Sequence, residues 1–353
     1  MNKTLSTVLR ILLFLAIGLS ILWLLYSKLN KDYQAECALK GIPAGECSLI
    51  KKVFDDIGTA NYFWLAVIVL CFLISNLSRT IRWSYLIDSM GYTTRLINGF
   101  HCIMLGYFAN LGFPRIGEIV RAGTFAKYEK VPVEKVMGTV TADRIIDLFS
   151  FFLVFLLALA LEFDTLWAYL NQNMVQIDAS EIASSGWTWG VLVMVLLVAV
   201  VLYRFRHKLM AHSFFVKLVG LARGFLEGIQ SVRYVSKPFS FVFHSVMIWC
   251  MYYLMTYLCF EAFEPTSSLG PRAGLLVFVF GSLGMVIPTP GGMGSYHALA
   301  VAALVLYGIH ADDAFSFAMI IFFTVNIFGN ILFGLIALLL LPGLNANYQP
   351  MRE

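Results

Sequence analysis

Long runs of apolar residues dominate the chain, and short polar segments separate them. Six runs approach the roughly 20 residues with which an α-helix crosses a hydrocarbon core. Stretches such as Phe151–Leu161 are apolar at every position, whereas a membrane β-strand alternates apolar and polar residues. The pattern predicts an all-α polytopic integral membrane protein with about six full spans, at 9–27, 61–78, 145–162, 187–203, 239–260 and 315–341.

Two further apolar stretches are interrupted by helix-breaking residues. One, 96–113, ends in Gly112-Phe113-Pro114, and the other, 273–308, is broken around Pro290. Proline and glycine stop a helix there. The pattern predicts two broken or re-entrant hairpins of opposite orientation, at about 96–118 and 273–308, in a single membrane domain covering 1–353. Each arm of the second has only about 15 apolar residues, which favours a dip, although two crossings stay open.

The distribution of Lys and Arg predicts the orientation. Of 353 residues, 59% are hydrophobic and 13% charged, and 19 of the 25 basic residues fall in five segments: 1–10, 79–95, 114–144, 204–238 and 342–353. The positive-inside rule places these segments and both termini in the cytoplasm, with 28–60 and 163–186 outside. Segment 204–238 alternates basic and apolar residues, which predicts either an amphipathic helix on the cytoplasmic leaflet or a solvated helix between spans.

The cysteines separate into two groups. Four fall in apolar runs, where a small buried hydrophobe is the simplest interpretation. Cys37 and Cys47 lie in a polar segment that is predicted to face outside, where they are a possible disulfide in an oxidising compartment. The spacings match no metal site and no nucleotide-binding loop. We therefore expect no cofactor, and the one-sided basic residues indicate lipid rather than nucleic acid as the partner.

The densest group of polar residues follows the first break. It comprises Asn110, Pro114, Arg115, Gly117, Glu118 and Arg121, followed by Asp143, Arg144 and Asp147. Irregular backbone at membrane depth persists only where protein or a water-filled cavity covers it, and Arg matches phosphate through paired hydrogen bonds. Glu118 is three residues from both Arg115 and Arg121, which predicts that it pairs with and orients them. The alternative is that these residues are interfacial and closed into salt bridges.

Asp143 and Asp147 are one helical turn apart at the start of the span 145–162. That spacing places both carboxylates on one helix face. Paired acids can carry protons or hold a cation, but they can also lock Arg144 or Arg121 into the fold. The sequence leaves both interpretations open and favours the structural one.

A second group of candidate residues surrounds the second break. The loop comprises Pro288, Pro290, Gly291, Gly292, Gly294, Ser295 and His297. A loop of this kind before a helix offers backbone N–H groups and a positive dipole end to an anion, but glycines also permit tight packing.

Three asparagines lie within the expected spans. Asn326, Asn330 and Asn76 are predicted to hydrogen-bond between helices or to line a cavity.

The residues of these two groups, in this order, resemble the lysylphosphatidylglycerol synthase transmembrane family, the flippase-like membrane half of the bacterial multiple peptide resistance factors. The resemblance covers about 10–341 and implies a domain that moves or houses a polar-headed lipid in the bacterial cytoplasmic (inner) membrane. The soluble aminoacyl-transferase half is missing, so we do not expect synthesis of lysylphosphatidylglycerol. His297 stands where the family often has an acidic residue. Stand-alone members also imply a lipid-modifying enzyme or glycosyltransferase as a partner and a polyprenyl-phosphate sugar as a substrate.

Three functions remain open from the sequence. The first is translocation of an anionic phosphate-headed lipid between the two broken segments. For this function the sequence leaves a homo-oligomer open. The second is a membrane-embedded enzyme that modifies lipid headgroups with Asp143, Asp147 or His297 as acid and base, although no nucleophile has a neighbouring base. The third is a secondary transporter of small anions or amino acids.

Overall fold

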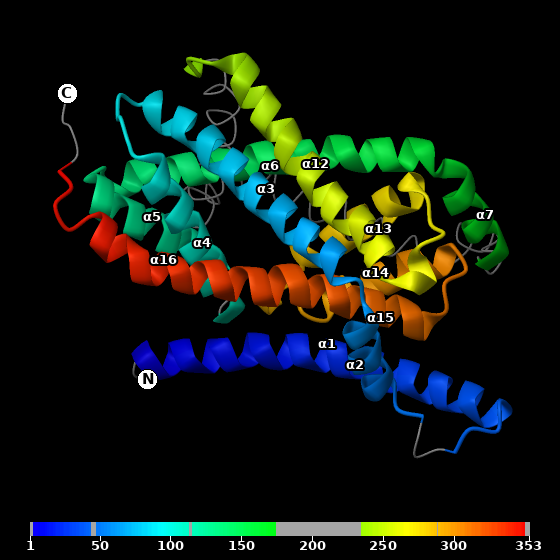
Figure 1. Ribbon diagram of the computed structural model, residues 1–353. Helices are drawn as coiled ribbons and strands as arrows, with labels where there is room; N and C mark the ends of the chain where they lie inside the picture. The colour runs from blue at the N-terminus through cyan, green and yellow to red at the C-terminus, as the bar shows by residue number, and fades with distance from the viewer. Residues whose placement is uncertain (1–2, 44–46, 113–114, 174–233, 288, 350–353) are drawn as a thin grey trace, which may run out of the picture.

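The computed structural model describes residues 3–43, 47–112, 115–173, 234–287 and 289–349, and in these residues all regular structure is helical. Figure 1 shows the arrangement. The elements are α1 (Lys3–Leu39), α2 (Leu49–Thr59), α3 (Tyr62–Asp88), α4 (Leu96–Gly112), α5 (Ile116–Glu129), α6 (Val133–Leu161), α7 (Phe163–Asn173), α12 (Pro238–Ala262), the 3-10 turn η2 (Glu264–Thr266), α13 (Pro271–Val286), the 3-10 turn η3 (Pro290–Gly292), α14 (Ser295–Leu306), α15 (Ala311–Phe322), the π-helical η4 (Phe323–Gly329) and α16 (Asn330–Leu344).

Four of these helical segments are long and apolar enough to cross a membrane. They are α3, α6, α12 and the continuous segment Ala311–Leu344. Each overlaps one of the expected spans almost completely, and the span expected at 9–27 lies within α1. The span expected at 187–203 and most of the amphipathic segment 204–238 lie outside the described residues. The chain is therefore an all-α polytopic membrane protein, as the apolar pattern predicted.

Two helices extend well beyond the spans expected within them. The span expected to end at residue 78 continues in α3 to Asp88, and the one expected to begin at residue 145 starts in α6 at Val133. Charged residues marked the expected boundaries, but here they lie inside the helices. Arg82 and Asp143 are completely buried and pair with each other, which removes the cost of an isolated charge in an apolar helix.

Helices α4 and α5 form the first hairpin. Their close approach rests on glycine: a Cβ on Gly106 would stand 2.8 Å from the carbonyl oxygen of Gly117. At the turn, Asn110 Oδ1 accepts a hydrogen bond of 2.8 Å from the backbone N–H of Gly117. Asn110 therefore closes the hairpin and is engaged by the backbone. Pro114 lies outside the described residues.

Helices α13 and α14 form the second hairpin, with η3 at its tip. The tip turns through three glycines with positive φ: Gly291 at 59°, Gly292 at 78° and Gly294 at 84°. Glycine adopts this region without steric cost, so the run of glycines permits a tight reversal. Ser295 is buried and donates to the carbonyl oxygen of Gly284 at 2.7 Å, which fastens the tip to the opposite arm.

The tips of the two hairpins meet inside the protein. The side chain of Leu111, at the end of α4, lies 3.6 Å from the position that a Cβ would take on Gly291. Helix α1 covers the same tip, because a Cβ on Gly18 would stand 3.3 Å from the ring of Pro290. The two broken segments therefore contact each other at their tips, whereas the cavity that the sequence predicted between them stays a prediction.

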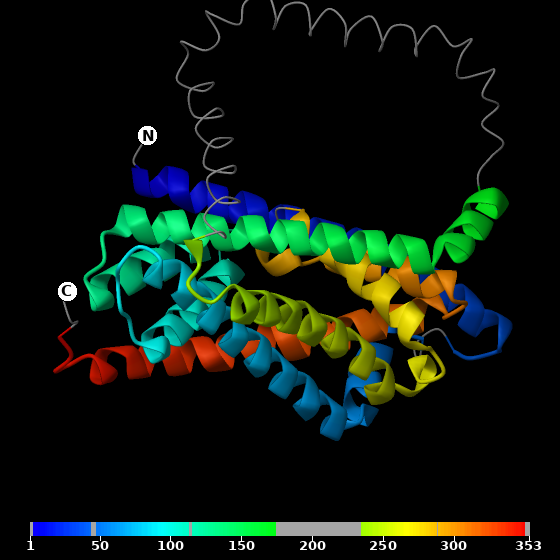
Figure 2. The same cartoon turned by 90° about the horizontal axis from the view of Figure 1, so that it is seen from above.

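The connections fall at two opposite ends of the helical bundle. In Figures 1 and 2, both ends of the described chain lie at the same end as the loops between α3 and α4 and between α5 and α6. The loops between α1 and α2 and between α14 and α15 lie at the other end. Helices α3 and α12 pack side by side, and the segment from α15 to α16 runs the length of the bundle (Figure 1).

Candidate functional site

Three helices bring five charged side chains together in the protein interior. Arg79 and Arg82 come from α3, Arg121 from α5, and Asp143 and Asp147 from α6. Arg79 Nη1 donates to Asp147 Oδ2 at 2.6 Å and to Asp143 Oδ2 at 3.2 Å. Arg82 Nη2 donates to Asp143 Oδ1 and, at 2.6 Å, to Asp147 Oδ1. Arg121 Nη1 donates to Asp143 Oδ2 at 3.1 Å. We call these five residues the charge network.

The charge network has an excess of positive charge. Its three guanidinium groups face two carboxylates, and four of the five side chains are at most 5% exposed. A buried ion needs a partner, since removing one partner from a buried pair typically costs about 3–5 kcal/mol. One net positive charge at this depth therefore favours an anion in contact with the network.

Of the three arginines in the charge network, Arg121 has the most spare hydrogen-bonding capacity. Its guanidinium carbon lies 3.8 Å from the centre of the Trp83 ring, a cation–π contact that fixes the plane of the group. Trp83 is itself held by its indole N–H, which donates to Thr139 Oγ1 at 3.0 Å. Within the described part of the chain, Arg121 Nε and Nη2 are buried and have no hydrogen-bond partner. These N–H groups can bind an anionic oxygen.

The structure overturns the predicted role of Glu118. Its Oε1 lies 2.9 Å from Arg144 Nε, and it pairs with neither Arg115 nor Arg121 in the described residues. The three-residue spacing fails because Arg115 precedes α5 in a left-handed conformation, with φ of 65°. Arg121 points instead to Asp143. The predicted locking of Arg121 by Asp143 is present, and Arg144 is held mainly by Glu118.

Arg115 itself is exposed at the tip of the first hairpin. It makes no ion pair with another described residue. A non-glycine residue with positive φ is uncommon. The exposed position of Arg115 therefore depends on a backbone conformation that costs energy. Its position leaves the guanidinium accessible to a ligand at the hairpin tip.

The second loop offers less to a ligand than its sequence suggested. Pro290, Gly292 and Ser295 are buried, and Ser295 Oγ lies 3.0 Å from Thr289 Oγ1. His297 is completely buried, with its ring centre 4.6 Å from that of Phe322 and 6.1 Å from that of Phe315. It therefore lies in an aromatic pocket and does not face an open cavity. What the loop contributes is the tight tip that contacts α4.

The asparagines within the helices bond mainly to their own helices. Asn76 donates to the carbonyl oxygen of Phe72 at 2.8 Å, and Asn330 donates to that of Asn326 at 3.1 Å. Asn326 lies in the π-helical segment η4, a feature that often occurs at functional sites. The sequence pattern of the last span did not reveal it.

An apolar groove of about 750 Å³ lies between α6, α12 and α13, as far as the described residues define it. Ile146, Trp249 and Tyr253 are among the residues that line it. Ser245 also lines the groove, and its hydroxyl lies 3.5 Å from Arg82 Nη1. The groove therefore begins beside the charge network.

Sequence reasoning missed Arg79 and Arg82, which it assigned to a cytoplasmic segment. A signal was available in their spacing. They are three residues apart, as on one helix face, and follow an apolar run without a proline or glycine between them. Charges that continue an apolar helix without a breaker indicate partners within the bundle.

Two helical hairpins whose tips are in contact, with a buried charge network beside them, belong to an all-α polytopic membrane protein. A model of one family, described as the lysylphosphatidylglycerol synthase TM region, matches residues 49–334. The chain belongs to this family.

Two curated relatives are archaeal membrane proteins of the group UPF0104. One, from Methanothermobacter thermautotrophicus, is 28% identical over 266 residues, which are 67% of this chain and 73% of the relative. The other, from Methanocaldococcus jannaschii, is 31% identical over 98 residues, or 26% of this chain and 29% of the relative. No solved structure matches the chain. Because both relatives are archaeal, the expected location in a bacterial inner membrane stays a prediction.

Proposed function

We propose that the protein translocates a lipid with an anionic phosphate headgroup. The headgroup enters between the two hairpins while the hydrocarbon chains remain in the bilayer. The observation that carries the proposal is the excess positive charge of the charge network, with two unpaired N–H groups on Arg121. A planar guanidinium donates two parallel hydrogen bonds to a phosphate. Membership of a family with a lipid-synthase name supports the same class of substrate.

The apolar groove supports a lipid over a small anion. A free phosphate needs only the charged pocket, whereas a lipid also needs an apolar surface for its chains at the same depth. Ser245 joins the two features, because it lines the groove and approaches Arg82. In the proposal, the headgroup contacts Arg121 and Arg115 and the chains run along α6 and α12.

The proposal includes a topology in which the hairpins dip into the bilayer from opposite faces, with both termini and residues 114–144 in the cytoplasm. The arms support this, since α4 has 17 residues, α13 16 and α14 12, fewer than the roughly 20 of a full crossing. Lys130 is exposed at the end of α5. A single cysteine placed there is expected to react with an impermeant maleimide only after the membrane is opened, and labelling of intact cells would reject this topology.

Reconstitution tests the transport activity. The purified protein is placed in liposomes with a fluorescent nitrobenzoxadiazole-labelled phosphatidylglycerol, and dithionite bleaches the label that reaches the outer leaflet. We expect faster bleaching of the inner pool than in protein-free liposomes. Arg121→Gln is expected to slow it about ten- to hundred-fold, because a hydrogen bond to a charged group contributes about 1.5–3 kcal/mol.

Lys127→Gln is the matched control, since Lys127 is an exposed basic residue on the same helix and makes no ion pair with another described residue. It is expected to leave the rate unchanged. Equal rates for the unmodified protein and Arg121→Gln would reject the site. Uptake of radioactive inorganic phosphate without lipid movement would identify a small-anion transporter instead.

A further inference from the structure

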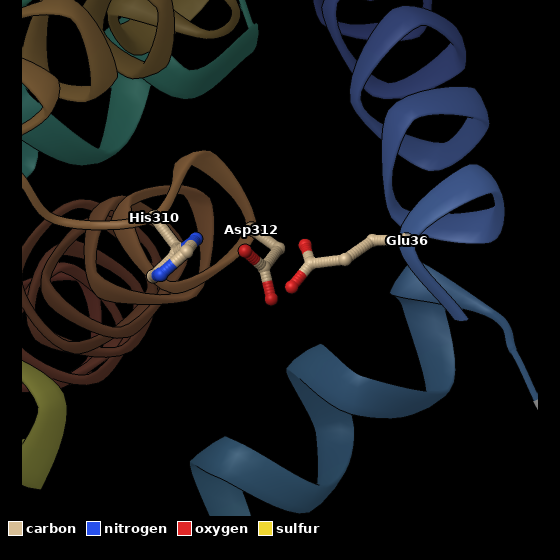
Figure 3. A group of neighbouring side chains, drawn as sticks. All are labelled: Glu36, His310 and Asp312. Atoms are coloured by element: carbon tan, nitrogen blue, oxygen red, sulfur yellow. The ribbon is translucent and has the colours of Figure 1, made fainter. Parts of the chain in front are cut away.

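A second group of ionisable side chains lies at the opposite end of the bundle from the chain ends. Glu36 comes from the last part of α1, His310 immediately precedes α15, and Asp312 lies in the first turn of α15. One ligand atom from each residue lies within 4.8 Å of the other two. Figure 3 shows the carboxylates of Glu36 and Asp312 pointing toward each other, with the His310 ring beside them.

The local charge balance favours a cation at this position. The surrounding cluster contains four carboxylates, those of Glu36, Asp56, Asp312 and Asp313, and two ammonium groups, those of Lys40 and Lys52. Lys52 is committed to Asp313 at 2.6 Å and Asp56 at 2.8 Å. Two negative charges in excess remain beside the imidazole.

The ligand-bearing segments are held in place independently of any ion. Cys37 and Cys47 form a disulfide, with their Cα atoms 6.3 Å apart, and this bond adjoins Glu36 in the sequence. Asn30 Oδ1 also accepts a hydrogen bond of 2.9 Å from the backbone N–H of Leu49. The last turns of α1 are thus tied to the start of α2, and Lys52 of α2 is tied to α15.

We propose that Glu36, His310 and Asp312 form a binding site for a divalent transition-metal ion, with zinc as the best match. One imidazole and two carboxylates suit Zn²⁺, which binds such ligands at about 2.0–2.2 Å, with a fourth position open to water. Tetrahedral coordination brings ligand atoms about 3.3 Å apart. Small rotations of three side chains achieve this, because His310 is exposed and Glu36 and Asp312 are partly exposed.

Two ion pairs compete with an ion at this position, Lys40 with Glu36 and, at 3.7 Å, Lys52 with Asp312. Lys40 donates to Glu36 Oε1 at 2.7 Å and lowers the pKa of Glu36. The Lys40 side chain is 63% exposed, and an exposed pair of this kind is weak. A dication therefore displaces the ammonium. The bound ion would join α1, which covers the tip of the second hairpin, to α15, which packs against α14.

Calorimetry on the oxidised, detergent-solubilised protein tests the site. The protein carries a tag without histidine and is first stripped with EDTA. We expect one Zn²⁺ ion per chain, and at least tenfold weaker binding by His310→Ala and by Asp312→Asn. Asp55→Asn is the matched control, because Asp55 is exposed on α2 and makes no ion pair with another described residue.

Two outcomes would overturn the site. The first is a Zn²⁺ affinity that His310→Ala leaves unchanged, since the chain has six histidines and another could then be the ligand. The second is Ca²⁺ binding as tight as Zn²⁺ binding and independent of His310, because hard cations prefer oxygen ligands. That result would indicate an ordinary acidic surface. Equal size-exclusion profiles for all variants show that loss of binding is not loss of folding.

Discussion

Hairpin α4–α5 is attached to the rest of the protein through charges, whereas hairpin α13–α14 is held by close packing of small residues. In the first, Arg121 and Glu118 bind Asp143 and Arg144 of α6. The second has a single basic side chain, Arg272, in its first turn. The two hairpins therefore differ in the kind of contact that attaches them to the rest of the protein. In the proposed function, an anion competes for the contacts of the first hairpin, while the second hairpin forms the surface against which the tip of the first lies.

The attachment of the first hairpin is also reinforced at its open end. Glu129, the last residue of α5, accepts hydrogen bonds from Asn98 of α4 and, at 2.9 Å, from the hydroxyl of Tyr348 after α16. Asn98 and Asn345 exchange two hydrogen bonds of 2.8 Å. The open end of the first hairpin is therefore closed by hydrogen bonds.

The largest expected effect follows from removing a carboxylate of the charge network. Asp143→Asn leaves three buried arginines with one carboxylate, and we expect a loss of about 3–5 kcal/mol in the free energy of unfolding. Arg121→Gln, in contrast, leaves two arginines and two carboxylates, and is expected to fold with a smaller loss. Unfolding in detergent, followed by tryptophan fluorescence, measures both. Asp164→Asn on the exposed start of α7 is the control.

If Asp143→Asn and Asp164→Asn unfolded alike, the charge network would not hold the first hairpin in place. If Arg121→Gln proved as unstable as Asp143→Asn, the positive excess would not be available to an anion.

The second effect tests the packing of the other hairpin. A Cβ on Gly284 would stand 2.6 Å from the carbonyl oxygen of Ser295, which is backbone and cannot turn aside. Gly284→Ala is expected to cost about 1–3 kcal/mol. A Cβ on Gly123 in α5 would have no heavy atom within 4 Å, so Gly123→Ala is expected to stabilise by about 0.5–1 kcal/mol. Opposite signs in thermal unfolding would support the comparison, and equal signs would contradict it.

The breaks of both hairpins could be predicted from sequence because they depend on local chemistry. Clusters of proline and glycine favour the end of a helix through their own backbone chemistry, and the glycines at 291–294 occupy positive φ as such a run predicts. The apolar lengths of α6 and α12 were likewise local properties. These features explain why the class of fold and the place of the tips were predictable.

The charge network could not be predicted, because its pairs join residues far apart in the chain. Arg82 and Asp143 are 61 residues apart, and no spacing rule connects them. The error on Glu118 has the opposite origin, since a local helical rule was applied across Arg115, which is not helical. The positive-inside count also included Arg79 as a loop residue, although Arg79 is buried within α3. The count does not consider how far a helix continues past its apolar run, and this length places Arg79 inside the protein.

A smaller effect is expected at the open end of the first hairpin. Burial and the hydrogen bond to Glu129 raise the pKa of Tyr348 to about 12. The neutral hydroxyl therefore donates to Glu129, and this contribution is complete below the unfolded pKa of about 10 and lost as the pH rises through 12. Tyr348→Phe is expected to cost about 0.5–1.5 kcal/mol. When Glu129→Ala with Tyr348→Phe is compared with Glu129→Ala alone, this loss should disappear, and full persistence of the loss would exclude the hydrogen bond.

The smallest effect on stability is expected at Arg115. This residue also tests whether the tip of the first hairpin contacts the headgroup. Arg115 and Lys130 are exposed basic residues with positive φ that flank the same helix, at 65° and 56°. Asparagine tolerates this conformation, so Arg115→Asn and Lys130→Asn are each expected to change the free energy of unfolding by less than about 0.5 kcal/mol. Only Arg115→Asn is expected to slow lipid movement in liposomes, several-fold, because Arg115 lies at the tip where the hairpins meet and Lys130 lies at the other end of α5. Equal transport by the two variants would show that the tip arginine does not contact the headgroup, and the binding of the anion would then rest on the buried charge network alone.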